Sequence, residues 1–270
     1  MPRMPAMFIP HGGGPCFFMD WNPPHEWDRH RRFLEELADT LPERPRALLV
    51  ISGHWEEPAF TVQTSPAPPL LFDYGGFPPH TYQLTWPAPG DPELAERVLG
   101  LIRGAGLPAA ADAVRGFDHG VFVPLKVAFP DADIPTIQLS VASDLDPGRH
   151  IALGQALAPL RDEGVAIIGS GNTYHNMGVM MQSLRGGPRG GVAGAAFDAW
   201  LTETMTLPDP AERNRRLVHW SDAPGGRDAH PREEHLIPLH VVAGAGGSDI
   251  GRKTFEDQVL GAVESAFRFG

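Results

Sequence analysis

Residues 47–55 read ALLVISGHW, an apolar run that closes on a small residue, a glycine and a histidine. The run shows no alternation of polar and apolar side chains, so it predicts a strand over 47–52 that is buried on both faces. Open α/β sheets bind ligands beyond the carboxyl ends of their strands. We therefore expect His54 to face a binding site and Gly53 to permit close approach there. A single histidine in such a place can equally bond a neighbouring carbonyl.

Length and composition favour one globular domain over residues 1–270. Hydrophobic residues make up 42% of the chain and charged residues 20%, as in ordinary globular proteins. The net charge of −11, without basic tracts, argues against nucleic acid or an anionic membrane as a partner. Cys16 is the only cysteine, which excludes an internal disulfide and favours a reducing, cytoplasmic location. The sequence predicts neither a leader nor a membrane-spanning segment.

Two more predicted strands end beside a histidine. An apolar strand expected over 6–10 runs into His11, which three glycines follow, and this turn can fold tightly around a metal or an anion. A buried strand expected over 164–171 ends in small residues, and His175 comes four residues later. Both positions repeat the arrangement at His54, so the carboxyl edge of one sheet would gather these side chains.

Two further histidines stand near acidic residues. His119 follows Asp118, whose carboxylate either orients or charges the imidazole or simply caps the helix that begins there. His235 lies in a stretch, 233–242, that begins with two acids and then turns apolar, as a helix does when its first turn faces a cavity. Neutral imidazole is the commonest metal-ligand side chain and suits Zn, Fe, Cu and Ni. Clustering of these five histidines would therefore favour a first-row metal.

The remaining patterns predict helices that separate the strands. Helices are expected over 25–41, 91–104, 149–160 and 197–205, and further strands over 134–140 and 262–269. Prolines predict an irregular loop over 57–87, which either covers an active site with its aromatic side chains or packs on itself, and glycines predict a surface loop over 183–194. The fold class is therefore α/β, a single domain with a central, mostly parallel sheet covered by helices on both faces.

Seven motifs along the chain resemble, in order, those of the class III extradiol ring-cleaving dioxygenases, in particular the DOPA 4,5-dioxygenase-like branch. The motifs are His11-Gly-Gly-Gly-Pro, Ser52-Gly-His-Trp, Asp73-Tyr-Gly-Gly-Phe-Pro, Phe117-Asp-His-Gly, Pro130-Asp-Ala-Asp-Ile-Pro-Thr-Ile-Gln-Leu-Ser, Gly169-Ser-Gly-Asn-Thr-Tyr-His-Asn and Glu234-His-Leu-Ile-Pro-Leu. The resemblance implies that His11, His54 and His235 bind a metal. It also implies that His175 is a catalytic acid/base and that His119 is a second active-site histidine beside oxygen and substrate.

The same resemblance implies a non-haem Fe(II) cofactor, with Zn(II) able to occupy the site in purified protein. The partners would be O2 and a DOPA-like catechol, both oxygen atoms would enter a muconic semialdehyde-type product, and the chain could form a homodimer. Asp118, Glu234 and Tyr74 would lie next to the substrate or the ligands. Two departures stand out. The bacterial branch often has His-Gly-Ser-Pro in place of the three-glycine turn, and related protocatechuate-type enzymes use a carboxylate as third ligand, whereas we assign that role to His235.

Two other functions fit part of this pattern. A zinc-dependent hydrolase is one, because three histidines with an open position also activate water. A non-catalytic metal-binding protein on the same fold is the other, since fold does not determine function. His119 and His175 argue against the second, because a binding protein has little use for an acid/base pair. The loop 60–89 and the arginines Arg185 and Arg189 are candidates for choosing the substrate.

Overall fold

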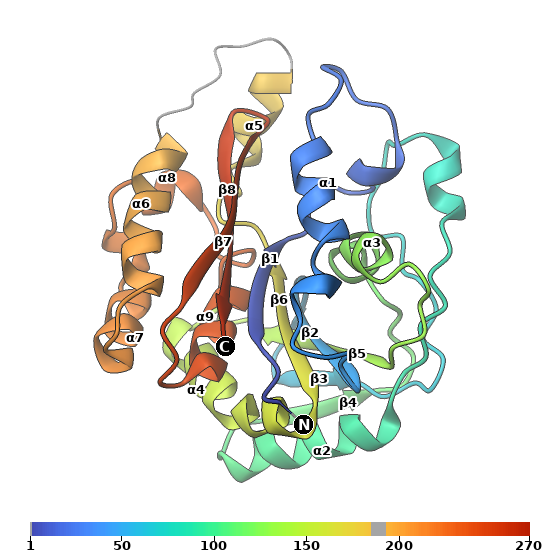
Figure 1. Ribbon diagram of the computed structural model, residues 1–270, viewed down its shortest axis with the longest axis vertical. Coiled ribbons are helices and arrows are strands. Elements are labelled where there is room, and N and C mark those ends of the chain that lie inside the picture. The colour runs from blue at the N-terminus through green and yellow to red at the C-terminus, as the bar shows by residue number, and fades with distance from the viewer. Residues whose placement is uncertain (1, 185–192) are drawn as a thin grey trace.

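The computed structural model describes residues 2–184 and 193–270, and one twisted sheet runs through its middle (Figure 1). Within the described residues this sheet holds eight strands in the order β4-β3-β5-β2-β6-β1-β8-β7. Their bounds are β1 (Ala6–Pro10), β2 (Ala47–Glu57), β3 (Phe60–Gln63), β4 (Ala109–Asp112), β5 (Thr136–Ala142), β6 (Val165–Gly171), β7 (Arg252–Val259) and β8 (Ala262–Phe269).

The centre of the sheet is parallel, whereas its flanks are mixed. Strands β5, β2, β6 and β1 pair in parallel with one another, and each is buried along its apolar run. On the flanks, β3 pairs antiparallel with β5, β8 with β1, and β7 with β8. The predicted α/β class with a mostly parallel central sheet is confirmed. The carboxyl ends of the neighbouring strands β2, β6 and β1 consequently lie side by side.

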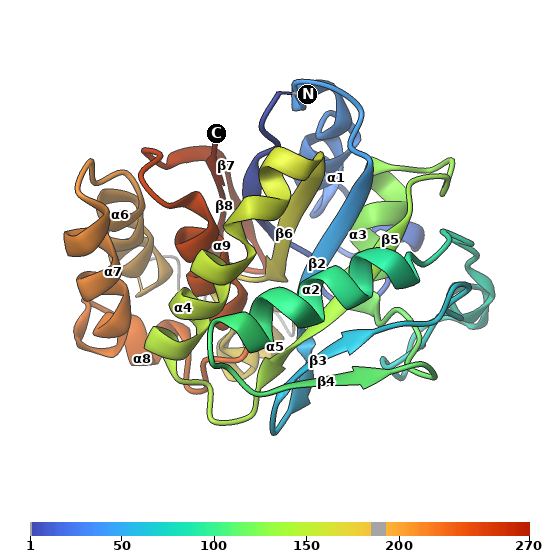
Figure 2. The same ribbon diagram turned by 90° about the horizontal axis from the view of Figure 1, so that it is seen from below.

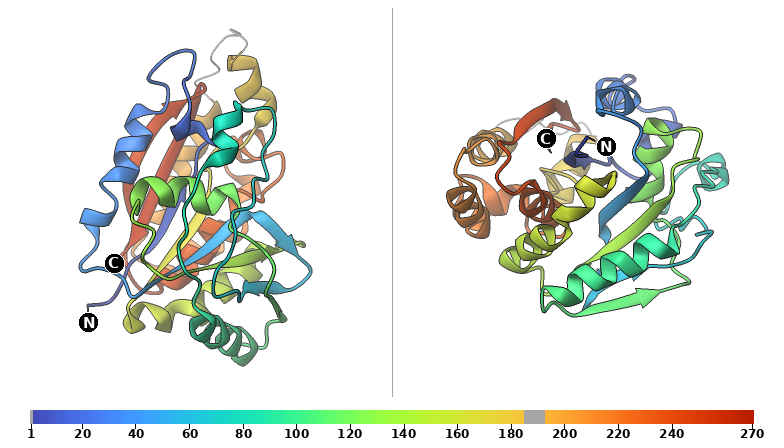
Figure 3. Two further views of the ribbon diagram at one scale, coloured as in Figure 1. Left: turned by 90° about the vertical axis from the view of Figure 1, so that its right-hand side faces the viewer. Right: turned by 60° about the horizontal axis from the view of Figure 1, so that its bottom comes forward.

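Helices cover both faces of this sheet. Figure 2 shows α2, α4 and α9 on one face and α1 and α3 on the other. Figure 3 shows α6 and α7 outside the β7–β8 hairpin, where α6 packs against β8. The helices are α1 (Asp28–Glu35), α2 (Pro92–Gly104), α3 (His119–Ala128), α4 (Pro147–Leu157), α5 (Met177–Leu184), α6 (Ala193–Met205), α7 (Pro210–Val218), α8 (Gly226–Ala229) and α9 (Ile237–Gly246). None of the described helices combines the length and apolar character needed to cross a membrane.

An Asp-Pro pair starts three of the helices. The predicted cap of α2 is present, because the Asp91 side chain accepts a hydrogen bond from the Leu94 amide at 2.9 Å. Asp146 and Asp209 cap α4 and α7 in the same way. A proline follows each of these aspartates and fixes a helical φ where no intrahelical donor is needed. The third pair predicts a helix, α7, that the sequence analysis missed.

The helix expected over 25–41 is shorter than predicted. Helix α1 covers only Asp28–Glu35, and a separate 3-10 turn follows at Ala38–Thr40. His25 has a φ of 71°, which lies in the left-handed region and cannot belong to a right-handed helix. The apolar spacing therefore predicted the helix correctly in its middle, whereas the backbone at both ends of the expected range is not helical.

The irregular loop expected over 57–87 contains regular structure. Strand β3 lies in it between two prolines, and a 3-10 turn follows at Pro79–Gln83. Strand β3 is four residues long and is held by its neighbours β4 and β5, so its own sequence carries little signal. Strand β7 was also missed, although β8 was predicted correctly. The loop expected over 183–194 lies mostly outside the described residues, and its two ends belong to α5 and α6.

A buried arginine ties the ends of the chain to the core. Arg161 is fully buried, and its guanidinium donates to the carbonyl oxygens of Met4 at 2.7 Å, Ala245 at 2.9 Å and Phe269 at 3.1 Å. It also pairs with the Asp249 carboxylate at 2.7 Å. The start of β1, the end of α9 and the end of β8 are thereby joined at the edge of the sheet opposite to the histidines.

Candidate metal centre and active-site cavity

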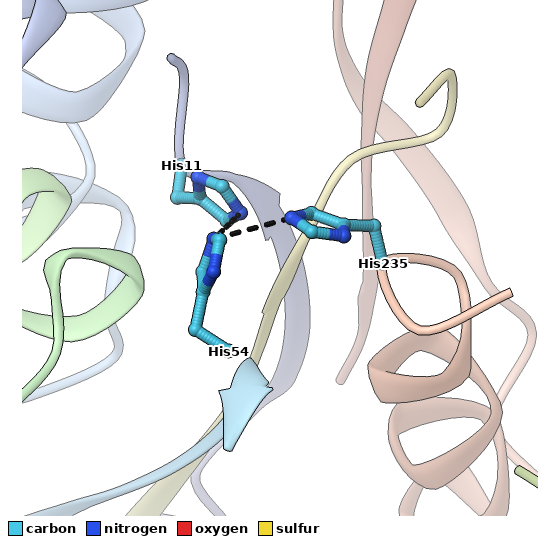
Figure 4. Close-up of side chains that lie close together, drawn as sticks. All are labelled: His11, His54 and His235. Atoms are coloured by element: carbon cyan, nitrogen blue, oxygen red, sulfur yellow. Dashed lines mark hydrogen bonds between the residues drawn. The ribbon is translucent and has the colours of Figure 1, made fainter. Parts of the chain in front are cut away.

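Three histidines from distant parts of the chain converge at the carboxyl edge of the sheet (Figure 4). His11 follows β1, His54 lies on β2, and His235 lies in the turn before α9. The Nε2 atom of His54 is 3.2 Å from that of His11 and 3.1 Å from that of His235. Each of the three offers a nitrogen within 4.8 Å of the others. The sequence placed His54 beyond its strand, but β2 continues through it to Glu57, with a shift of register after Ser52.

Glycines allow these segments to approach so closely. A side chain on Gly171 would place its Cβ 2.0 Å from the carbonyl oxygen of His235, and one on Gly53 would place it 2.8 Å from the carbonyl oxygen of Glu234. Backbone hydrogen bonds fix the approach, because His11 donates to the Gly171 carbonyl at 3.0 Å and Asn172 donates to that of His235 at 3.1 Å. The strand ends therefore hold the histidines through backbone contacts that only glycine permits.

The spacing of the three nitrogens fits a first-row metal ion. Imidazole nitrogens bind such ions at about 2.0–2.1 Å, so two ligands lie about 2.9–3.0 Å apart at a right angle and about 3.3–3.4 Å apart at the tetrahedral angle. The observed 3.1 and 3.2 Å fall between these values. His235 Nδ1 is 3.1 Å from the Glu234 carboxylate and is the natural donor there, which leaves a lone pair on Nε2. A metal ion between the three rings would accept a lone pair from each of them.

Burial keeps these imidazoles in the form that binds metals. Burial, reinforced by His119, lowers the pKa of His54 to about 3. Burial and the neighbouring His54 likewise hold the pKa values of His11 and His235 well below the usual value of 6.5. A histidine must be neutral to bind a metal, so the donor set is ready at neutral pH without losing protons.

Asp73 orients a fourth histidine, His119. Its Oδ1 accepts a hydrogen bond from His119 Nδ1 at 2.8 Å and another from the His119 amide at 3.0 Å. Burial alone would raise the pKa of Asp73, but the hydrogen bonds and charge of His119 outweigh it and lower that pKa. The His119 ring lies 3.9 Å from that of His54, centre to centre, and lines the cavity described below. His119 therefore directs Nε2 away from Asp73.

Asp118, expected either to orient or charge His119 or to cap the helix that begins there, has other partners. Its carboxylate accepts hydrogen bonds from Ser52 Oγ at 2.8 Å and from the Gln138 amide, and it pairs with Arg115 at 3.2 Å. Burial is the main cause that raises the pKa of Asp118. The residue starts α3 without capping it through its side chain. The hydrogen-bond partner of the His119 ring is therefore Asp73, 46 residues away in the chain, and not the adjacent Asp118.

Glu234 joins the metal-binding cluster to a fifth histidine. Its Oε1 lies 3.2 Å from His175 Nδ1 and 3.1 Å from His235 Nδ1, and the two rings stack with centres 3.5 Å apart. Arg232 approaches the other carboxylate oxygen at 3.4 Å. Burial opposes ionisation, but the hydrogen bond from His175 leads the causes that lower the pKa of Glu234. One carboxylate therefore orients both His175 and His235.

A cavity of about 660 Å³ opens over the histidines. Tyr74 lines it with its ring 5.7 Å from that of His119, while its hydroxyl donates to the Thr81 carbonyl at 2.6 Å. Burial raises the pKa of Tyr74 to about 12, so the phenol keeps its proton. Of the predicted site residues, the five histidines and Tyr74 meet at this cavity. Glu234 lies behind two of the histidines, and Asp118 lies apart in the core.

Several residues of the cavity were not predicted from the sequence. Asp73 precedes Tyr74 in a quoted motif, but its contact with His119 spans 46 residues and depends on the path of a long loop. Met177, Met180 and Met181 come from α5, which was not predicted. Their spacing of three and four residues was the available signal, because it places them on one face of a helix.

Comparisons with known proteins show what this chain is similar to. Residues 5–268 match the family model described as the catalytic LigB subunit of aromatic ring-opening dioxygenase. The chain is 42% identical over 266 residues to "4,5-DOPA dioxygenase extradiol" of Beta vulgaris, covering 96% of this chain and 93% of the relative. It is 37% identical over 244 residues to the Escherichia coli protein of the same description, covering 90% and 85%. The crystal structure of an uncharacterized Escherichia coli protein superposes with a TM-score of 0.79 at 32% identity, covering 99% of this chain and 100% of the other.

Proposed function

Because the chain belongs to the family of the catalytic LigB subunit of aromatic ring-opening dioxygenases and is an extradiol enzyme, we propose that it inserts both atoms of O2 into a catechol that carries a side chain, as DOPA does. The product would be a muconic semialdehyde-type compound. The observation that carries this proposal is the convergence of three imidazole nitrogens, one from each ring, within 4.8 Å of one another at a cavity that all three histidines line. Two further histidines line the same cavity.

We assign the metal to His11, His54 and His235. Three imidazoles on one side of an ion leave its other positions for substrate, and Fe(II) is the cofactor that this chemistry requires, with Zn(II) able to occupy the same ligands. When bound, Fe(II) would hold both catechol oxygens and O2 at one centre and pass electrons between them. The chain itself supplies the fixed, neutral donor set and a cavity that limits access of water.

His175 is suited to moving the catechol proton. Its Nδ1 faces the Glu234 carboxylate at 3.2 Å, so the donor proton sits there and Nε2 is free to accept one from a hydroxyl group. The stacked His235 ring, 3.5 Å away, fixes the position of that imidazole beside the metal ligands. Glu234 would then stabilise the imidazolium that forms and let His175 return the proton when the ring opens.

His119 is suited to stabilising negative charge on oxygen. Asp73 holds its Nδ1 at 2.8 Å, so when His119 carries a proton on Nε2, that proton points into the cavity. A preformed donor in a site shielded from water stabilises developing charge more strongly than water does. Tyr74 forms part of the wall against which the substrate ring would pack.

An anaerobic reconstitution with Fe(II) tests this proposal. The protein is loaded with iron, mixed with catechols in aerated buffer, and followed by O2 consumption and by the yellow absorbance of a semialdehyde. With ¹⁸O2, both labelled atoms should appear in the product. Zinc-loaded protein serves as the control and should consume no O2. If fully iron-loaded protein consumes no O2 with any catechol, the proposed function is wrong, and hydrolysis by the zinc form becomes the function to test.

Three further predictions accompany this function. We propose that residues 1–270 act as one catalytic domain, in a reducing, cytoplasmic compartment, and that the chain can form a homodimer. Light scattering coupled to gel filtration measures the oligomeric state. Limited proteolysis tests the single domain, because one domain should resist cleavage as a unit.

A further inference from the structure

The cavity has two chemically different ends. Its floor carries the five histidines and Asn172. Its walls carry apolar side chains from separate segments: Met19, Trp21, Tyr74, Phe77, Pro78, Met177, Met180, Met181 and Leu260. Among the twenty described residues that line the cavity, none is lysine, arginine, aspartate or glutamate. The two nearby acids, Asp73 and Glu234, do not line the cavity, and their carboxylates bond histidines that do.

The polar atoms of the aromatic wall are turned away from the cavity. Trp21 Nε1 donates to the Cys16 carbonyl at 2.8 Å, and the Tyr74 hydroxyl donates to the Thr81 carbonyl at 2.6 Å. Both side chains therefore present ring surface to a ligand. The Tyr74 and Phe77 rings meet edge to face with centres 5.5 Å apart, which fixes this part of the wall. A ligand that reaches it meets aromatic carbon and no free hydrogen-bonding group from these rings.

Helix α5 contributes three methionines to the cavity wall. Met180 is buried at 5% exposure, while Met177 and Met181 are 49% and 39% exposed. Large apolar side chains that remain exposed at the rim of a cavity indicate a surface that is covered when a ligand binds. Methionine is flexible and adapts to apolar ligands of different shape. Leu260, in the turn between β7 and β8, completes this side.

The volume exceeds what the reacting ring needs. The cavity measures about 660 Å³, whereas catechol itself has only eight non-hydrogen atoms. Cavities of about 300–1,000 Å³ suit ligands of drug size. The ring would bind at the histidine end, and the remaining space would receive a substituent.

On the basis of the proposed function, we propose that the substrate is a catechol whose ring substituent is uncharged and apolar, an alkyl or aryl group, rather than an amino-acid side chain. An ammonium or carboxylate group placed among these walls would lose its hydration without gaining a partner from the described residues, which is costly. An alkyl group would instead be transferred from water to methionine and aromatic surface, which is favourable in proportion to its area.

A charge series of catechols tests the proposal. The probes are 4-propylcatechol, dopamine, 3-(3,4-dihydroxyphenyl)propionate and DOPA, which share the ring position and differ in side-chain charge. With iron-loaded enzyme, kcat/KM should be highest for 4-propylcatechol and at least tenfold lower for DOPA. From 4-methylcatechol to 4-butylcatechol it should rise about fourfold for each added methylene group. A preference for DOPA or for either singly charged probe over 4-propylcatechol would overturn the proposal.

Two matched variants locate the preference in the cavity. Met177→Arg places a cation at the rim and should raise the kcat/KM of the propionate probe relative to 4-propylcatechol by up to about fivefold, the range for a solvent-exposed ion pair. Ile250→Arg adds the same charge at a 55% exposed isoleucine that does not line the cavity, and should leave the ratio unchanged. If the two variants had the same ratio of kcat/KM values for the two probes, the assignment of Met177 to the cavity wall would be contradicted.

Calorimetry separates this proposal from the proposed function. Binding of 4-propylcatechol and of DOPA is measured without oxygen, so no turnover is needed. Tighter binding of 4-propylcatechol, with a negative heat-capacity change, supports the apolar wall even if no catechol is cleaved. Cleavage of all four probes with DOPA bound most tightly would leave the dioxygenase function intact and refute the apolar substituent.

Discussion

Replacing Asp73 by asparagine removes the charge from the side chain that holds His119 while keeping one oxygen as an acceptor. In the native protein, Asp73 Oδ1 accepts from His119 Nδ1 at 2.8 Å and from the His119 amide at 3.0 Å. The Asp73 side chain is only 20% exposed, so water screens this interaction weakly. The substitution should therefore loosen the orientation of the His119 ring without removing any of the three proposed metal ligands.

The size of the effect follows from the loss of charge assistance. A hydrogen bond to a charged group contributes about 1.5–3 kcal/mol, and one between neutral groups about 0.5–1.5 kcal/mol. The difference of about 1–1.5 kcal/mol corresponds to roughly a five- to tenfold lower kcat, because each 1.36 kcal/mol is a factor of ten. Steady-state turnover of 4-propylcatechol by iron-loaded enzyme measures kcat, and elemental analysis measures the iron content, which should not change.

Asp118→Asn is the matched control. Asp118 is fully buried and bonds Ser52, Gln138 and Arg115, so its substitution should alter stability more than turnover. If Asp118→Asn lowered kcat as much as Asp73→Asn, or if Asp73→Asn lost its iron, the assignment of Asp73 as the positioning partner of His119 would be wrong.

The contribution of Asp73 to the stability of the fold depends on pH. Because the pKa of Asp73 is lowered in the folded protein, its ionised form stabilises the fold above the unfolded pKa of about 3.9, and this stabilisation is lost as the pH falls further. The melting temperatures of wild type and Asp73→Asn should therefore differ at neutral pH and converge below about pH 4. Melting curves followed by circular dichroism measure this, and a constant difference at every pH would contradict it.

Five other substitutions probe the site and the core. His54→Ala should lose both bound metal and turnover, whereas His175→Ala should keep the metal and lose turnover; equal metal loss in the two would refute this division. Burial raises the pKa of Glu264 to about 8, so the folded protein keeps a proton that the unfolded chain releases, and stability should fall as the pH rises from about 4.5 to 8. Glu264→Gln should flatten that slope in urea titrations, and an unchanged slope would assign it to another group. Arg161→Met should lower the free energy of unfolding by about 3–5 kcal/mol, because it leaves buried carbonyl groups and Asp249 without their partner. Arg3→Met breaks an exposed ion pair and should lower it by less than about 1 kcal/mol. Comparable losses of stability for the two variants in thermal melts would contradict the structural role of Arg161.

The part of the site that could be predicted from the sequence was the position of the histidines at the ends of strands. The apolar runs before His11 and His54 form β1 and β2, which both pair in parallel with β6, and parallel strands of one sheet bring their carboxyl ends to the same edge. The same reasoning placed His54 outside its strand, because a shift of register between Ser52 and Glu56 cannot be read from composition. The general position of the histidines follows from topology, and their distances do not.

Contacts made by loops and by short strands could not be predicted from the sequence. The choice between Asp73 and Asp118 as partner of His119 depends on where a proline-rich loop turns back, and adjacency in the chain favoured the wrong carboxylate. Strand β3 is defined by its neighbours, because four residues cannot form a stable strand alone. Tertiary packing decides both cases.

The carbonyl oxygen of His235 leaves no room for a methyl group on Gly171. Placing the five histidines on another scaffold would therefore not recreate the site unless the glycines that let their backbones approach were included. A comparison of distant sequences should therefore check for glycine at positions 53 and 171 as well as for the histidines. An alanine at either position would force the backbone of residues 234 and 235 to shift.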